Sequence, residues 1–206
     1  MPFASTRLVA DRLSMRFGPR RLFDDLTVIV EPGAPLAVTG ANGAGKSTLL
    51  LLFAGLLAPT AGASELWVGG ARVEARDVPR TVGYLAPALN VYDALTARET
   101  LAFLARARGL DHAAARVDAT LDRVGLAGRA DEPVAAFSTG MRQRLRVATA
   151  LVHDPPVLLM DEPGATLDAA GRDLVASLVA DDAHIVVLAT NDPTEAGLCA
   201  RRMALG

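Results

Sequence analysis

The sequence predicts an α/β fold with a mostly parallel core sheet, an N-terminal antiparallel β part and an inserted helical arm. Three observations support this class: strand and helix patterns alternate at both ends of the chain, the middle is helical, and a glycine-rich segment, 40–48, stands between a strand and a helix. With 206 residues, of which 51% are apolar, the chain fits one medium domain, 1–206. We expect 1–87 and 141–206 to form the core and 88–140 to form the arm.

The first third of the chain has patterns typical of strands joined by turns. A hairpin is expected around Gly69 and Gly70, because paired glycines suit a tight turn. One helix is expected from about Ser47 to Ala58, where Pro59 stops it. The other strands expected here are 8–17, 26–30 and 35–40.

The middle of the chain predicts two helices. Thr96 and Glu99, three residues apart, form a capping-box pattern before the apolar segment 101–109. A second helix is expected to open at Asp111 and to bury one apolar face. That face carries Val117, Leu121 and Val124. The first of the two helices is expected to end at Gly109 and the second at Gly125.

The last third returns to alternating elements. A helix is expected after Ser138 and another after Asp168. Asp192, Pro193 and Glu195 form a start signal for a last helix. Buried strands are expected at 157–160 and 184–189.

The composition argues against several classes of protein. A net charge of −2 and a pI near 5.9 do not suit a protein that grips nucleic acid through a broad basic field. The longest purely apolar run, 49–58, is far shorter than the ~20 residues that cross a bilayer as a helix. No basic start followed by an apolar stretch opens the chain, and Cys199, the sole cysteine, has no partner for an internal disulfide. A reducing cytoplasm is therefore expected.

Segment 40–48, GANGAGKST, carries the strongest chemical signal. It matches the pattern of glycine, four residues, glycine, lysine and serine or threonine, and it lies between a strand and a helix as phosphate binding requires. Glycines let the backbone wrap an anion, and the helix that follows adds the positive end of its dipole. Lys46 is the sole lysine of the chain, and its compact ammonium is expected to reach the β- and γ-phosphates. The Ser47 hydroxyl is expected to hold Mg²⁺.

Two adjacent carboxylates follow the expected strand at 157–160. Ligands gather at the C-terminal ends of strands in open α/β sheets, so Asp161 and Glu162 are expected beside the phosphate loop. Asp161 would complete the Mg²⁺ environment with Ser47, and Glu162 would orient or deprotonate an attacking water. Without the phosphate loop, a solvated acidic turn before Pro163 would be the better interpretation.

Segment 137–145, FSTGMRQRL, resembles the signature sequence of the ATP-binding cassette (ABC) ATPase family. In that family a serine and a glycine at a helix N-terminus face the γ-phosphate of ATP held by the other subunit, and Ser138 and Gly140 match them. Thr139 stands where the family usually has a second glycine, and Met141 stands where glutamine is common. A serine before a helix is most often a plain N-cap, but its place ahead of the two carboxylates favours the signature.

The resemblance runs through nearly the whole chain and implies a P-loop NTPase fold of ABC type. Phe17 falls where the family stacks an aromatic ring on adenine, although an aromatic residue here could equally belong to the core. Asp168, the last residue of ATLD (165–168), resembles the loop that touches the opposite subunit, and it can also cap a helix. The residues assigned to the nucleotide are Phe17, Gly40, Ala41, Asn42, Gly43, Ala44, Gly45, Lys46, Ser47 and Thr48.

Two positions depart from the family pattern. Pro87 stands where a glutamine normally touches Mg²⁺ and the attacking water, and Asn191 stands where a histidine usually meets the γ-phosphate. The expected catalytic residues are Glu162, Lys46 and Asn191. Asn191 is uncharged and can donate one hydrogen bond to the γ-phosphate. We expect a turnover that is slow or dependent on a partner. The three histidines, expected to be surface or structural, are His112, His153 and His184.

The resemblance implies an ATP-binding and ATP-hydrolysing transporter subunit. ATP and Mg²⁺ are its cofactors, and a head-to-tail homodimer or heterodimer is implied, since the phosphate loop and the signature of one subunit cannot reach the same nucleotide. Transmembrane subunits are the expected partners, without nucleic acid, and the inner face of the cell membrane is the expected location. Tyr92 and Leu95 are expected to contact the partner or to anchor the arm.

Alternatives remain open at this point. A soluble ABC ATPase acting on DNA or ribosomes would usually carry a long coiled coil or a second cassette, and the sequence has neither. A GTPase would carry an Asn-Lys-x-Asp motif after the phosphate loop, and the sequence has none. A small-molecule kinase transfers phosphate to a substrate hydroxyl, whereas the second carboxylate, Glu162, suits water as the nucleophile. The brevity of the chain resembles small export-type cassettes, including haem exporters for cytochrome c assembly.

Overall fold

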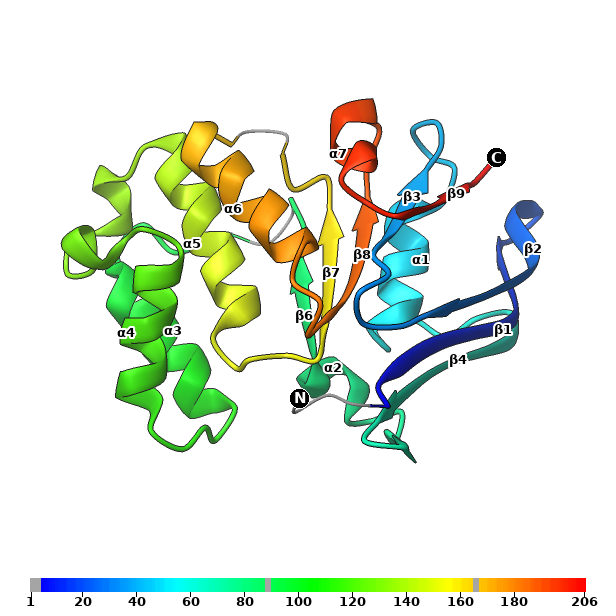
Figure 1. Ribbon diagram of the computed structural model, residues 1–206, viewed down its shortest axis with the longest axis horizontal. Helices are drawn as coiled ribbons and strands as arrows, with labels where there is room; N and C mark the ends of the chain where they lie inside the picture. The colour runs from blue at the N-terminus through cyan, green and yellow to red at the C-terminus, as the bar shows by residue number, and fades with distance from the viewer. Residues whose placement is uncertain (1–4, 88–89, 165–166) are drawn as a thin grey trace.

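The computed structural model describes residues 5–87, 90–164 and 167–206, whose strands form two sheets (Figure 1). The antiparallel sheet contains β1 (Arg7–Phe17), β2 (Arg20–Val30), β4 (Ala61–Val68) and β5 (Ala71–Arg72), in the order β2-β1-β4-β5. The parallel sheet contains β3 (Leu36–Thr39), β6 (Val82–Leu85), β7 (Val157–Asp161), β8 (Ile185–Ala189) and β9 (Arg201–Ala204), in the order β6-β7-β8-β3-β9. The predicted α/β class with an antiparallel N-terminal part is confirmed.

Helices cover the parallel sheet and form one end of the molecule. Figure 1 shows α3 and α4 at the end opposite the antiparallel sheet, with the parallel sheet between them. The helix α1 packs between the two sheets, where it contacts β4, β7 and β8. The helices are α1 (Lys46–Phe53), α2 (Val78–Thr81), α3 (Ala97–Ala107), α4 (Ala113–Arg123), α5 (Thr139–Leu151), α6 (Ala169–Val179) and α7 (Pro193–Gly197), with short 3₁₀ turns at Ala127–Arg129 and Val134–Ala136.

The parallel sheet separates two hydrophobic cores. Every residue of β7 and β8 is buried, as expected of parallel strands covered on both faces. Successive side chains of a strand point to opposite faces, so Val157 and Leu159 join the core around α1. Leu158 and Met160 join the core shared with the helical arm. The carboxyl end of β7 is thereby fixed from both sides.

The first helix ends earlier than the sequence predicts. α1 stops at Phe53 instead of running to Ala58, and the expected stop at Pro59 is wrong. Gly55 adopts a left-handed conformation with φ +68°, which lets the next amide turn back and donate to the carbonyl of Leu51 at 2.9 Å. The glycine therefore closes the helix before the proline is reached.

Other local predictions are mostly confirmed. Thr96 and Glu99 exchange the hydrogen bonds of a capping box at the start of α3. The hairpin turns through Gly69 and Gly70, both with positive φ. The start of α4 is corrected from Asp111 to Ala113, because the preceding residue takes a left-handed conformation that delays helical geometry. The three apolar residues expected on one face of α4 and its end are buried.

Two short strands of the parallel sheet are not predicted from the sequence. β6 has four residues and follows a single turn of helix, and β9 carries two arginines at the edge of the sheet, where charge is tolerated. The predicted boundaries of the arm stay a prediction: residues 88 and 89 lie outside the described residues, and α5 runs across the boundary at 140. Among the described residues, no helix combines the length and apolarity needed to span a membrane.

Candidate nucleotide site

The phosphate loop joins β3 to α1. Gly40, Gly43 and Gly45 have φ values of +144°, +82° and +104°, a region that other residues rarely adopt. A Cβ on Gly40 would lie 2.3 Å from the carbonyl oxygen of Leu205, so only glycine fits. The helix begins directly after Gly45, and its first backbone N–H groups point out of its N-terminus. Such a terminus favours an anion.

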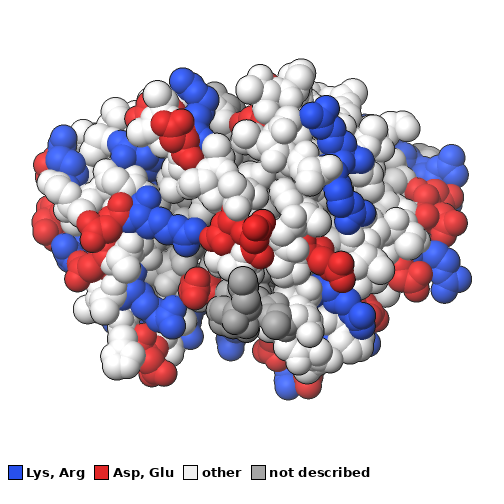
Figure 2. All heavy atoms as spheres, in the orientation of Figure 1, with Lys and Arg blue, Asp and Glu red and all other residues white. Residues whose placement is uncertain are grey.

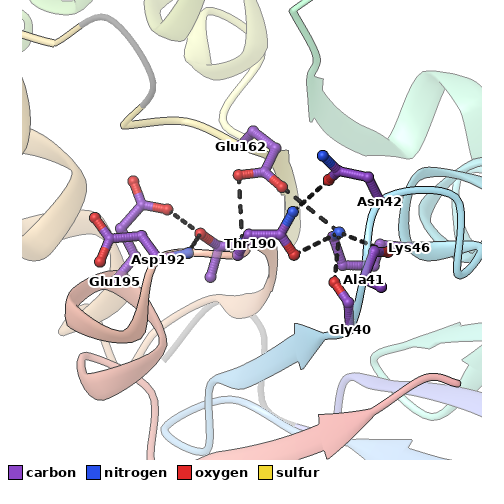
Figure 3. Close-up of polar contacts among 9 residues, drawn as sticks. Gly40, Ala41, Asn42, Lys46, Glu162, Thr190, Asp192 and Glu195 are labelled. Carbon is purple, nitrogen blue, oxygen red and sulfur yellow. Dashed lines mark hydrogen bonds and ion pairs between the residues drawn. The ribbon is translucent and has the colours of Figure 1, made fainter.

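Lys46 lies at the centre of this loop and is nearly buried, with 6% of its surface exposed. Its Nζ donates to the carbonyl of Gly40 at 2.9 Å and to Oδ1 of Asn191 at 2.8 Å. It also lies 3.7 Å from Oε1 of Glu162. Figure 3 shows the carboxylate of Glu162, which follows β7, turned toward Lys46 of the phosphate loop. The structure thus brings the three predicted catalytic residues together.

Asp161 is the last residue of β7 and stands directly before Glu162. Its side chain is buried, and within the described residues its Oδ1 has no hydrogen-bond partner. Burial, together with the nearby negative charge of Asp161, raises the pKa of Tyr84 to about 12. An unpaired buried carboxylate oxygen is costly unless a donor or a cation meets it. Mg²⁺ prefers oxygen ligands, and the carboxylate oxygen of Asp161 and the hydroxyl oxygen of the exposed Ser47 are ligands of this type. The two residues therefore fit a magnesium ion.

Glu162 turns its carboxylate into the cleft on a strained backbone. Its φ is +47°, which is unfavourable for a residue with a Cβ, and its N–H donates to the carbonyl of Ala189 at 2.8 Å. Its Oε2 accepts from the backbone N–H of Asn191 at 3.4 Å. Strain of this kind is common where a side chain has a functional orientation.

The cleft above the loop has a volume of about 410 Å³. Phe17 lines it and is 51% exposed, so the alternative of a core residue is wrong for this position. Arg20, which the sequence analysis does not single out, also lines the cleft and donates to the carbonyl of Gly43 at 2.8 Å. The sequence indicates Arg20 only weakly, as a basic residue three positions after Phe17. The other lining residues are Leu22, Asn42, Gly43, Gly45, Lys46, Ser47, Thr48 and Glu162.

The signature segment lies elsewhere on the molecule. Ser138 caps α5 by accepting from the backbone N–H of Met141 at 3.2 Å, and both Ser138 and Thr139 are exposed. Gly140 is buried, and a Cβ there would lie 2.6 Å from Oδ2 of Asp168. None of these residues is among those that line the cleft. The signature therefore takes no part in lining the cleft of its own chain.

Asp168, at the start of α6, lies against the signature segment at Gly140. Asp168 caps α6 by accepting from the N–H of Gly171 at 2.8 Å, so the cap interpretation holds. Its Oδ2 also lies 3.8 Å from the guanidinium of Arg144 on α5. Ala165 and Thr166, the first two residues of the predicted interface loop, lie outside the described residues. Pro87, the departure from the family pattern, is exposed just after β6.

A family model described as "ABC transporter" matches residues 23–165. The cytochrome c biogenesis ATP-binding export protein CcmA of Rhodopseudomonas palustris is 36% identical over 195 residues, 92% of this chain and 92% of that protein. The sulfate/thiosulfate import ATP-binding protein CysA of Gloeobacter violaceus is 37% identical over 196 residues, but the chain spans only 56% of its length. A solved ATP-binding subunit of an ABC transporter has a TM-score of 0.82 and 28% identity, with 96% of this chain and 85% of that chain covered. The chain belongs to the ABC transporter family.

Proposed function

We propose that the chain is an ATP-binding and ATP-hydrolysing subunit of an ABC transporter, which pairs around MgATP to drive transport through separate membrane subunits. One observation carries this proposal: a nearly buried ammonium at the end of a glycine loop lies 2.8 Å from Asn191 and 3.7 Å from Glu162. A phosphate chain bound on the loop would meet positive charge, a hydrogen-bond donor and a base in one place.

The residues of the cleft divide the work of hydrolysis. Ser47 and Asp161 would hold Mg²⁺, which supplies positive charge beside the phosphates. Lys46 binds β- and γ-phosphate oxygens, and Asn191 donates to the γ-phosphate. The carboxylate of Glu162 orients a water molecule and accepts its proton as the water oxygen bonds to the γ-phosphorus and the bond to ADP breaks. Because Pro87 offers no side-chain amide, basal turnover is expected to be slow.

A second ATPase subunit, identical or related, completes the site. Two observations support this arrangement: Ser138 and Thr139 are exposed, and no signature residue lines the cleft of its own chain. Asp168 lies against Gly140, so the interface loop and the signature would meet the partner on one surface. The residues that would close over the γ-phosphate of the other subunit are Ser138, Thr139, Gly140 and Met141.

A groove of about 590 Å³ between the arm and the core is the proposed contact with the membrane subunits. Tyr92 and Phe103 line it with large exposed side chains, 73% and 61% accessible, and Leu95 lies beside them. Exposed apolar side chains gathered in one groove are typical of a docking site. Burial lowers the pKa of Arg108 at the same groove, so an acidic side chain on the partner would offset the cost of its partial burial.

The inner face of the cell membrane is the proposed location, since ATP is cytoplasmic and the partners span the membrane. Figure 2 shows acidic and basic side chains interspersed on one face of the molecule, which does not resemble a nucleic-acid surface. Similarity to the cytochrome c biogenesis export protein over 92% of both chains supports an export type, with haem export as the finer proposal. An import protein is similar at nearly equal identity, so we assign the choice of direction to the membrane partner as part of this proposal.

Replacement of Lys46 by alanine tests the proposal. Lys46→Ala removes the sole lysine and should abolish MgATP binding and release of phosphate from ATP, measured by calorimetry and by a phosphate assay. Arg76→Ala is the control, because Arg76 is exposed and its side chain forms ion pairs at the surface with Glu74 and Asp77. Normal ATP hydrolysis by Lys46→Ala would overturn the assignment of the site.

A further inference from the structure

The side chains of Asn191 and Asn42 form an amide pair across the phosphate loop. Oδ1 of Asn191 accepts from the ammonium of Lys46 at 2.8 Å, and its Nδ2 donates to Oδ1 of Asn42. The orientation of the Asn191 amide is chemically determined, because an ammonium has only donors and the atom that faces it must be the oxygen. One side chain therefore uses its acceptor on Lys46 and its donor on Asn42.

The ammonium of Lys46 is satisfied by protein groups in this arrangement. It has three protons, and it donates to the carbonyls of Gly40 at 2.9 Å and Ala41 at 3.5 Å as well as to Asn191. Oε1 of Glu162 lies 3.7 Å away and adds charge neutralisation. A phosphate that binds Lys46 must replace at least one of these acceptors.

The donor of Asn191 is the group that a terminal phosphate can compete for. A phosphate oxygen is a charged acceptor, whereas Oδ1 of Asn42 is neutral, and charge-assisted hydrogen bonds are roughly twice as strong as neutral ones. Asn191 stands at the carboxyl end of β8, directly after buried Thr190, so its backbone is anchored while its side chain is exposed. A rotation of the side chain alone can transfer Nδ2 from one acceptor to the other.

We propose that Asn42 and Asn191 form a triphosphate-sensing pair, in which Asn42 holds Nδ2 of Asn191 until a γ-phosphate takes it. The inference rests on the proposed function. ADP has no γ-phosphate and leaves the pair intact, whereas ATP exchanges a neutral acceptor for a charged one. Asn191 therefore determines the preference of the site for ATP over ADP, and Asn42 opposes it.

Dissociation constants for MgATP and MgADP, measured by calorimetry, test the pair. Asn191→Ala should lower the ratio of ATP to ADP affinity about tenfold, the effect of one hydrogen bond to a charged group. Asn42→Ala frees the donor and should raise the same ratio severalfold, and it should have no effect on the ratio when Asn191→Ala is already present. Asn90→Ala is the matched control and should keep the wild-type ratio, because Asn90, the remaining asparagine of the chain, lines the groove between arm and core and not the cleft.

Two results would overturn the inference. One is a parallel loss of ATP and ADP affinity in Asn191→Ala, which would mean that the residue only supports the loop. The other is a fall of the ratio in Asn42→Ala. Asn42 and Asn191 are exposed, so thermal melting of each variant should match the wild type and exclude misfolding. Failure of the wild-type chain to bind either nucleotide would instead contradict the proposed function, together with the inference that rests on it.

Discussion

His153 shows how burial of one side chain makes stability depend on pH. Burial, reinforced by the positive charge of Arg108, lowers the pKa of His153 to about 4. One ring nitrogen, Nε2, lies 3.2 Å from the carbonyl oxygen of Val82, and Nδ1 is buried with no hydrogen-bond partner among the described residues. The imidazole is therefore neutral in the folded protein at neutral pH, which agrees with the structural role expected from the sequence.

The lowered pKa predicts a loss of stability in mild acid. In the unfolded chain this histidine takes up a proton below about pH 6.5, whereas in the folded chain it does so only near pH 4, so stability is lost as pH falls between these values. The loss at pH 5 should be about 1 to 2 kcal/mol relative to pH 7. Urea unfolding of wild type and His153→Gln at both pH values measures it.

The free energy of unfolding of His153→Gln should change less between pH 7 and pH 5 than that of the wild type. His112→Gln is the matched control, because His112 is exposed at the start of α4, and it should keep the wild-type pH dependence. Equal pH dependence in wild type and His153→Gln would show that other groups cause the acid sensitivity.

At the residue scale, the sequence predicts which residues bind phosphate or take part in catalysis better than it predicts which side chains contact one another. The phosphate loop and the two carboxylates are local patterns, and the structure places Glu162 3.7 Å from Lys46 of that loop. The contact of Lys46 with Asn191 joins residues 145 positions apart, and no local pattern encodes such a pair. Arg20 is missed for the same reason, since its partner is a backbone carbonyl 23 positions away. Phe17 is left open by the sequence, because cores and pockets use the same aromatic side chains.

At the element scale, the start of α3 depends on the capping box. The hydroxyl of Thr96 accepts from the N–H of Glu99 at 3.0 Å, and the carboxylate of Glu99 accepts from the N–H of Thr96 at 2.8 Å. Thr96→Ala should therefore lower the free energy of unfolding by about 1 kcal/mol. Thr96→Ser keeps the hydroxyl and should retain most of that stability.

Hydrogen exchange separates a local effect from a global one. The amides of the first turn of α3 should exchange faster in Thr96→Ala than in Thr96→Ser, while amides of β7 should change only with global stability. Unchanged exchange in the first turn of α3 would show that the capping box contributes nothing to this helix end.

Elements with strong local signals are the ones that the sequence predicts. Side-chain caps determine where α3 and α5 begin, and the backbone freedom of two glycines determines the hairpin turn. β6 and β9 lack such signals, because they are four residues long and become strands by pairing with β7 and β3. The end of α1 is predicted too late, since Gly55 ends the helix through its backbone before Pro59 acts.

At the scale of the whole molecule, two hydrophobic cores meet at the parallel sheet. One core surrounds α1 and the phosphate loop, and the other joins the sheet to the helices of the arm. The proposed docking groove lies where arm and core adjoin, and the signature segment starts α5, which packs on α3, α4 and α6. A movement of the arm would therefore shift the signature and the groove together, which suits a subunit that transmits closure to a partner.

The mass of the Glu162→Gln variant in solution tests the central claim most directly. Glutamine keeps the shape of the side chain but cannot accept the proton of water, so bound ATP should persist and hold two copies together. Light scattering should give twice the monomer mass with saturating MgATP and the monomer mass with MgADP, and the added change Lys46→Ala should restore the monomer. A monomer mass in saturating MgATP would contradict the account.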